Sequence, residues 1–253
     1  MKTERLSSSF LLAAMLFISG CATDKGPATV EEVRPGIIAG YLAAGAYPNS
    51  LELLPPPPEP GTAEFARDEA IAKKSFAYRN TERWTLAAND ADLHFPAAAN
   101  HFSAAIGFEI SDVETPYLYQ LLRRVLADAG LATYAAKDHY QRKRPFMRNG
   151  EPTATPDEEE MLRGDGSYPS GHTAIGWAWA LVLTEIVPER TDAILQRGYA
   201  YGQSRVVANV HWQSDVDTGR VIGAAAVARL HANPEFQSDL KKAKAEAARV
   251  RAE

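Results

Sequence analysis

Two segments near the middle of the chain carry residue types that bind anionic groups. Lys137 is followed seven residues later by Arg144, which precedes a proline. Residues 166–173 read GSYPSGHT, a pattern that would place Ser170 and Gly171 at the start of a helix. The first amides of a helix have no partner within it, and the helix dipole favours an anion there. Together these segments predict a cradle of cations and amide groups for a negatively charged ligand.

Two histidines and an aspartate add groups that can move protons or attack an electrophile. His172 ends the PSGH string, and Arg205 lies six residues before His211. His211 and Asp215 are four residues apart, so on a helix they lie on one face. A carboxylate in that position can accept a hydrogen bond from one imidazole nitrogen and fix which nitrogen stays basic.

Taken as one site, these clusters have the groups needed to transfer a dianionic phosphoryl group. The three cations and the amides would bind its oxygens and stabilise their charge. One neutral imidazole would attack phosphorus in line, and the other, protonated, would give its proton to the leaving oxygen. Water would then hydrolyse the phosphohistidine, with the second histidine acting as base.

Two other chemistries can be built from the same residues. His172, His211 and Asp215 form a two-histidine, one-carboxylate set that could hold a metal, although three neighbouring cations would repel a divalent ion. Ser170 could be the nucleophile of an esterase triad, but the chain has no G-x-S-x-G elbow and no alternation of strands and helices. The sequence therefore favours an anion site without a metal or another cofactor.

The segments that must position these groups show helical periodicity, without convincing β-alternation. Apolar residues recur at helical spacing from Leu118 to Ala129, and Gly130 interrupts that pattern. Residues 146–168 are acidic and contain several glycines and prolines, which predicts a long loop. Helices are expected over residues 62–79, 81–92, 113–137, 171–187, 190–209, 214–231 and 234–250. The fold class predicted is a single all-α domain over residues 62–253.

The N-terminus has the features of an export signal. Lys2 and Arg5 precede nine apolar residues at 10–18, a run shorter than the roughly 20 residues that span a bilayer. Residues 18–21 (ISGC) resemble the bacterial lipoprotein cleavage box, in which Cys21 would become the lipidated first residue. We therefore predict a lipoprotein signal peptide over residues 1–20 and a lipid-anchored, proline-rich segment over residues 21–61. Ala22 after the cysteine favours, by resemblance to sorted lipoproteins, a periplasmic protein held at the outer membrane.

The overall composition narrows the classes of partner. Apolar residues make up 45% of the chain and charged residues 23%, as in ordinary folded proteins. The formal net charge of −5, with no basic stripe, argues against nucleic acid as a partner. The single cysteine excludes an intrachain disulfide.

The order K-x6-RP, PSGH, SR-x5-H-x3-D matches all three motifs of the type 2 phosphatidic acid phosphatase (PAP2) superfamily. The form GSYPSGHT, together with SLELLPPPP at 50–58, RNTER at 79–83 and AKDHYQRKRPF at 136–146, resembles the class A bacterial non-specific acid phosphatases. The resemblance covers roughly residues 48–250. It departs in two respects. Residues 146–165 lack the cysteines that brace this loop in many relatives, and the chain has a lipoprotein box, whereas many relatives are freely periplasmic.

The resemblance implies a function and a role for each motif residue. The implied fold is the all-α PAP2/haloperoxidase type, and the implied activity is metal-independent hydrolysis of a broad range of phosphomonoesters, with possible transfer of phosphate to alcohols. His211 would be the phosphorylated nucleophile, Asp215 its orienting partner and His172 the general acid. The phosphate would be held by Lys137, Arg144, Ser170, Gly171 and Arg205. Family members are commonly oligomers built on dimers.

Three competing functions stay open at this point. A vanadium-dependent haloperoxidase uses a similar cradle to hold vanadate, but such enzymes are typically longer and lack GSYPSGHT. A lipid phosphate phosphatase would fit the lipid anchor, yet lipid-specific members usually embed their helices in the bilayer. A catalytically silent structural lipoprotein would not need intact motif positions.

Overall fold

The computed structural model describes residues 26–252. The predicted signal peptide and the lipidation residue Cys21 therefore lie outside the described residues. Within residues 26–252, none of the helices is long and apolar enough to cross a membrane.

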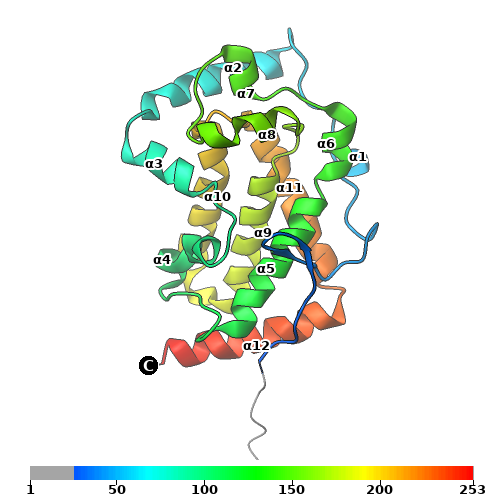
Figure 1. The fold of residues 1–253 in the computed structure, drawn as a ribbon, viewed down its shortest axis with the longest axis vertical. Helices are drawn as coiled ribbons and strands as arrows, with labels where there is room; N and C mark the ends of the chain where they lie inside the picture. The colour runs from blue at the N-terminus through cyan, green and yellow to red at the C-terminus, as the bar shows by residue number, and fades with distance from the viewer. Residues whose placement is uncertain (1–25, 253) are drawn as a thin grey trace, which may run out of the picture.

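The centre of the molecule is helix α9 (Gly171–Ile186), which packs against α10 (Thr191–Val207), α11 (Gln213–Leu230) and α5 (Pro116–Leu131). Figure 1 shows these helices side by side, with α12 (Pro234–Val250) lying across one end. Most residues of α9 are buried, as expected for a helix that is apolar on nearly every side. Glycines permit the close approach of its neighbours: a Cβ at Gly219 of α11 would lie 2.7 Å from the Ser170 carbonyl oxygen. Within residues 26–252 the fold is all-α, as predicted, except for one hairpin that was not predicted.

The other helices cover the end of the bundle that holds the motif residues, or its flanks. Thr62 caps α2 by accepting a hydrogen bond from the Phe65 amide at 3.2 Å, which places the helix start where the sequence indicated. The helices that cover this end of the bundle or its flanks are α2 (Ala63–Ser75), α3 (Glu82–Asn89), α4 (Ser103–Ile106), α6 (Tyr134–Tyr140), α7 (Pro145–Asn149) and α8 (Glu159–Arg163). Short 3₁₀ turns lie at Phe76–Tyr78, Ala97–Phe102, Pro156–Glu158 and Pro188–Arg190.

The prediction of an irregular loop over residues 146–168 was wrong in part. This segment contains most of α7, a 3₁₀ turn and α8. Pro145 and Pro156 each stand at the first position of a helical turn, where proline is favoured because no N–H is needed. Phe146 and Leu162 are buried in a small apolar cluster that includes Val207, so the segment folds back onto the end of α10.

The N-terminal segment contains the only strands within residues 26–252, and the sequence analysis did not anticipate them. β1 (Glu32–Arg34) pairs antiparallel with β2 (Ile37–Ile38) across a turn in which Gly36 has a φ of 78°. Proline followed by glycine fits a tight turn with one left-handed residue. Strands of two or three residues carry too little alternation to be recognised in a sequence.

A buried carboxylate ties this N-terminal segment to the bundle. Asp128 on α5 accepts hydrogen bonds from the amides of Tyr41 (2.8 Å) and Leu42 (3.1 Å). A Cβ at Gly40 would lie 2.1 Å from the Asp128 carboxylate, so only glycine fits there. Burial raises the pKa of Asp128 to about 6. Residues 37–42 are thus packed on the domain before α1 (Ser50–Leu53) begins.

Candidate active site

The two cations of the first motif come from α6 and from the residue that precedes α7. Lys137 is 4% exposed and Arg144 is 1% exposed. Both contact one carboxylate: Asp165 Oδ2 lies 3.0 Å from Lys137 Nζ and 2.7 Å from Arg144 Nη2. Burial, then the Arg144 charge, lowers the pKa of Lys137 to about 8, while Asp165 acts in the opposite direction. Asp165 thus neutralises part of a strongly positive site.

The PSGH string forms the capped start of α9. Ser170 is the N-cap residue; its hydroxyl oxygen accepts hydrogen bonds from the Thr173 amide (3.3 Å) and the Thr173 hydroxyl (2.9 Å). The Ser170 amide donates to the Asp215 carbonyl at 2.9 Å, which links this helix start to the third motif. Gly171 lines the pocket, so the positive end of the α9 dipole faces it.

His211 is held by the tight connection between α10 and α11. Asn209 adopts a left-handed conformation (φ 61°), and the His211 amide donates to the Arg205 carbonyl at 3.2 Å. Asp215 stands in the first turn of α11, with Oδ2 3.3 Å from His211 Nδ1 and 2.8 Å from the Trp212 amide. An ionised Asp215 makes Nδ1 the protonated nitrogen and leaves a lone pair on Nε2, which accepts from Arg144 Nη1 at 3.1 Å.

Asp215 is oriented in turn by a charged group that the sequence analysis did not single out. Arg142 Nη1 lies 2.5 Å from Asp215 Oδ1, and Arg142 Nη2 lies 2.9 Å from Asp68 on α2. Burial raises the pKa of Asp215, and the Arg142 guanidinium opposes that rise. Arg142 stands inside the segment AKDHYQRKRPF that supported the family resemblance, which was the available signal for it.

Arg205 is the most poorly paired cation of the three. Its side chain is fully buried, and none of its three guanidinium nitrogens has a hydrogen-bond partner within the described chain. The carboxylate of Glu158 is 4.0 Å away. A buried cation without hydrogen bonds is costly unless an anion binds to it. This geometry fits a guanidinium whose partner is a ligand.

His172 is the second histidine of the site. Its Nε2 lies 2.9 Å from the Ala91 carbonyl oxygen. Burial, followed by the charge of Arg205, lowers the pKa of His172 well below its usual value. Burial, followed by the charges of Arg144 and Lys137, does the same for His211. With only the protein's own charges around them, both imidazoles are therefore shifted toward the neutral form.

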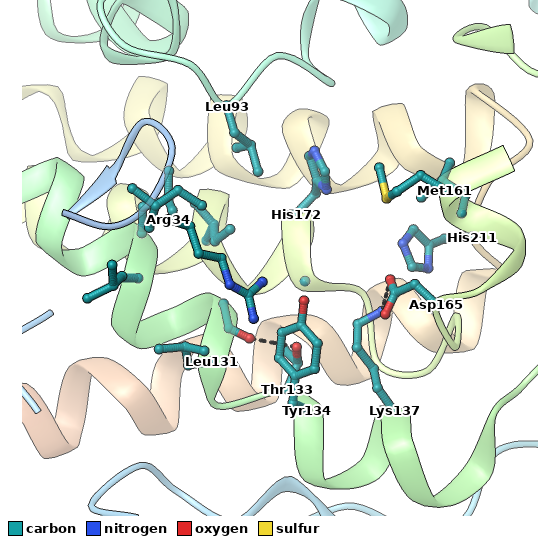
Figure 2. Close-up of a pocket in the computed structure, with 18 of the residues that line it drawn as sticks. Arg34, Leu93, Leu131, Thr133, Tyr134, Lys137, Met161, Asp165, His172 and His211 are labelled. Carbon is teal, nitrogen blue, oxygen red and sulfur yellow. Dashed lines mark hydrogen bonds and ion pairs between the residues drawn. The ribbon is translucent and has the colours of Figure 1, made fainter. Parts of the chain in front are cut away.

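The motif residues meet at one end of a cavity of about 310 Å³ (Figure 2). We name this end the ionic half; the pocket wall there includes Lys137, Arg144, Asp165, Gly171, His172 and His211. Ser170, Asp215 and Arg205 are fully buried and are not among the residues that line the pocket. Sequence reasoning missed Asp165, which directly precedes GSYPSGHT and is a common surface residue type in isolation.

The other end, which we name the apolar half, is built from separate parts of the chain. Leu131 and Tyr134 come from the end of α5 and the start of α6, and Leu93 follows α3. The hairpin adds Val33 and Ile37, so the N-terminal segment forms part of the pocket wall. The hairpin residue Arg34 also lines the pocket.

The structure bears on the two alternative chemistries. No group of three or more His, Cys, Asp or Glu side chains within residues 26–252 is arranged to hold a metal ion. His172 Nε2 faces the Ala91 carbonyl, and within residues 26–252 Ser170 makes no hydrogen bond with either histidine. The Ser170 hydroxyl is engaged in capping α9, which does not fit the nucleophile of a triad.

Comparison with known proteins gives strong matches. Residues 118–238 match the PAP2 superfamily. The chain is 51% identical to the non-specific acid phosphatase of Providencia stuartii over 212 residues, which cover 83% of this chain and 86% of the relative. It is 43% identical to the non-specific acid phosphatase of Salmonella typhimurium over 222 residues, which cover 84% and 89%. Among solved structures it is similar to a bacterial vanadium-dependent iodoperoxidase, with 18% identity, a TM-score of 0.48, and coverage of 70% of this chain and 52% of that one.

Proposed function

This chain belongs to the bacterial non-specific acid phosphatases of the PAP2 superfamily, and we propose that it hydrolyses a broad range of phosphomonoesters through a phosphohistidine on His211. The observation that carries the proposal is the pairing of two features in one site. His211 presents Nε2 to the pocket while Asp215 holds Nδ1, and the buried Arg205 guanidinium nearby has no hydrogen-bond partner within residues 26–252.

Substrate binding would give the unpaired Arg205 guanidinium an anionic partner. The phosphoryl oxygens would accept from Arg205, Lys137 and Arg144 and from the first amides of α9 at Gly171. The carboxylate of Asp165 contacts Lys137 and Arg144, so it must give way as the phosphate arrives. Arg144 would also turn its Nη1 group from His211 Nε2 to the phosphate, which frees the lone pair of the nucleophile.

In the first step, His211 Nε2 attacks phosphorus in line, and the bond from phosphorus to the ester oxygen breaks. His172 donates a proton to that oxygen, so the alcohol leaves neutral. The positive charge that develops on His211 is stabilised by Asp215 through Nδ1–H. The cations and amides stabilise the charge on the transferring group.

In the second step, His172 is neutral and accepts a proton from water. The hydroxide oxygen attacks phosphorus, the phosphorus–Nε2 bond breaks, and inorganic phosphate leaves. An alcohol in place of water would receive the phosphoryl group in the same way, which is the basis for proposing phosphotransfer as a second outcome of the same intermediate.

The proposal requires a proton on His172 when the substrate is bound. The charges of Arg205 and Arg144 contribute to the low pKa of His172. A dianionic phosphate against the same guanidinium groups counteracts that effect and raises the pKa of His172. The rate should therefore follow a bell-shaped pH profile on the acid side of neutral, which reports the coupled pair of histidines.

The test is hydrolysis of phenyl phosphate at about pH 5.5 with excess chelator, with and without orthovanadate. We expect turnover that resists the chelator, is inhibited by vanadate, and falls at least about 10³-fold in His211→Ala. His231→Ala is the matched control, because this histidine pairs with Glu185 away from the pocket. Turnover that needs a divalent metal, or that persists in His211→Ala, would contradict the proposal.

We further propose that the protein is a periplasmic lipoprotein attached to the outer membrane through Cys21, and that it assembles as an oligomer built on dimers. The support is the ISGC box at residues 18–21 for the anchor and the family resemblance for the assembly. Cys21→Ser should release the activity from the membrane fraction into the soluble fraction. Light scattering of the released protein would measure its mass, and a monomer would contradict the proposed assembly.

A further inference from the structure

The apolar half of the pocket is large for a site that needs only to bind phosphate. Its wall includes Val33, Ile37, Leu93, Leu131 and Ile175. The aromatic ring of Tyr134 stands between this surface and the ionic half (Figure 2). A phosphoryl group held by Lys137 and Arg144 would therefore direct the rest of its ester along an apolar wall.

One cation interrupts this apolar surface. Arg34 in β1 reaches into the pocket, and Figure 2 shows its guanidinium directed toward Tyr134. The Arg34 side chain makes no hydrogen bond or ion pair with any other residue in the described part of the chain. Its neighbour Glu32 instead accepts a hydrogen bond from the Gly36 amide in the hairpin turn. Arg34 thus offers unused hydrogen-bond donors at the apolar end of the cavity.

We propose that the apolar half is a subsite for the leaving group, and that Arg34 selects phosphomonoesters whose leaving group has a flat apolar body ending in a second anionic group. The apolar wall and Tyr134 would cover the body of the leaving group, and the guanidinium would bind a carboxylate at its far end. This inference rests on the proposed function, because it assigns the substrate class of the same site.

The size of the effect follows from the exposure of Arg34. The residue is exposed, and ion pairs in that setting are weak. We therefore expect a preference of about threefold in kcat/KM for the anionic leaving group, rather than a strict requirement.

The test compares phenyl phosphate with the phosphate ester of 4-hydroxybenzoate, which differs only in a para carboxylate, on the full chain. The wild-type protein should favour the carboxylated ester by about threefold, Arg34→Ala should remove that preference, and Arg34→Glu should reverse it. Arg67→Ala is the matched control, because Arg67 is an exposed arginine of α2 that does not line the pocket. Inhibition by inorganic phosphate should be the same in all four proteins.

If the ratio of kcat/KM for the two esters is the same in wild type, Arg34→Ala and Arg34→Glu, the inference is overturned and the proposed function stays intact. Failure of the wild-type protein to hydrolyse phenyl phosphate would instead overturn the proposed function. In that case, calorimetry with benzylphosphonate and its 4-carboxy derivative would test the subsite alone. Weaker binding of the carboxylated compound to Arg34→Glu than to wild type would support the proposed subsite, and equal binding would overturn it.

Discussion

The two halves of the pocket differ in how firmly the fold holds them. Lys137 and Arg144 of the ionic half, and the buried Arg205, are at most 4% exposed, and each lies in a helix or directly beside one. The apolar half is completed by the hairpin of β1 and β2, which has five strand residues. Arg34 in this hairpin is exposed. The proposed chemistry therefore depends on the packed bundle, whereas the proposed contacts to the leaving group depend in part on a segment laid over it.

This difference has a physical basis. Buried charges act strongly on a bound phosphate because little water screens them, but they require a rigid framework and compensating groups such as Asp165 and Asp68. Contacts on the apolar half are individually weak and do not need such a framework. Changes in the ionic half should consequently alter phosphate binding for every substrate, and changes in the apolar half should alter only the response to the leaving group.

The largest effect is expected from Arg205→Ala. Loss of the buried guanidinium removes donors for the phosphoryl oxygens, so kcat/KM for phenyl phosphate should fall about 10³-fold, or about 4 kcal/mol. Steady-state kinetics measures it, with the exposed Arg229→Ala as control. A loss within about twofold, under 0.5 kcal/mol, would show that Arg205 does not hold the transferring group.

The next effect concerns Asp128, which ties the N-terminal segment to α5. Its pKa is raised from 3.8 to about 6, so between these values the folded state binds more protons than the unfolded state. Stability from this group is therefore fully present below pH 3.8 and is lost as the pH rises through 6. We therefore compare the free energy of unfolding of the wild type with that of Asp128→Asn. The difference, wild type minus variant, should decrease by about 3 kcal/mol between pH 3.8 and pH 7.

Urea unfolding of both proteins at several pH values measures this difference. Subtracting the variant removes the opposite contribution of His172 and His211, whose lowered pKa values favour the unfolded state at low pH. A difference that does not change with pH would mean that Asp128 has no raised pKa in the folded protein.

A smaller effect is expected from Asp165→Asn. The Asp165 carboxylate forms ion pairs with Lys137 and Arg144, so a bound anion must displace it. An uncharged amide at this position should compete less well with the anion for the two cations. The inhibition constant of inorganic phosphate should fall about tenfold, or about 1.4 kcal/mol. Asp157→Asn is a matched control in the same acidic segment. Weaker inhibition in Asp165→Asn would mean that the carboxylate positions the cations instead of competing with the ligand.

A still smaller effect is expected from Tyr134→Ala in the apolar half. Removal of the ring should raise KM for phenyl phosphate about fivefold, or about 1 kcal/mol, by reducing contact with the leaving group. The inhibition constant of inorganic phosphate should not change. Tyr199→Ala, which removes an exposed tyrosine on α10, serves as control. A parallel change in phosphate inhibition would show that the two halves are not separable.

The same contrast explains what could be predicted from the sequence. The helices of the bundle were expected because their apolar residues recur at helical spacing, as in α5. The convergence of Lys137, Arg144, His172 and His211 was expected because their motifs resemble those of the PAP2 superfamily, whereas spacing along the chain could not establish it.

The rest depended on tertiary contacts. The hairpin is too short to show alternation, and the residues that follow it are held by Asp128, which lies 87 residues from Tyr41 in the chain. Asp165 and Arg142 are ordinary charged residues until the fold places them against Lys137 and Asp215. The segment at 146–168 has the composition of a loop, but burial of Phe146 and Leu162 makes short helices stable there.

The central claim is that His211 carries the phosphoryl group. The most direct measurement is rapid quenching of the reaction with phosphorus-labelled phenyl phosphate, followed by mass spectrometry of the digested protein. The account predicts a phosphoryl group that is stable to base and labile to acid, located on His211 and absent from His211→Asn. Label on Ser170, or full turnover without any label on His211, would contradict it.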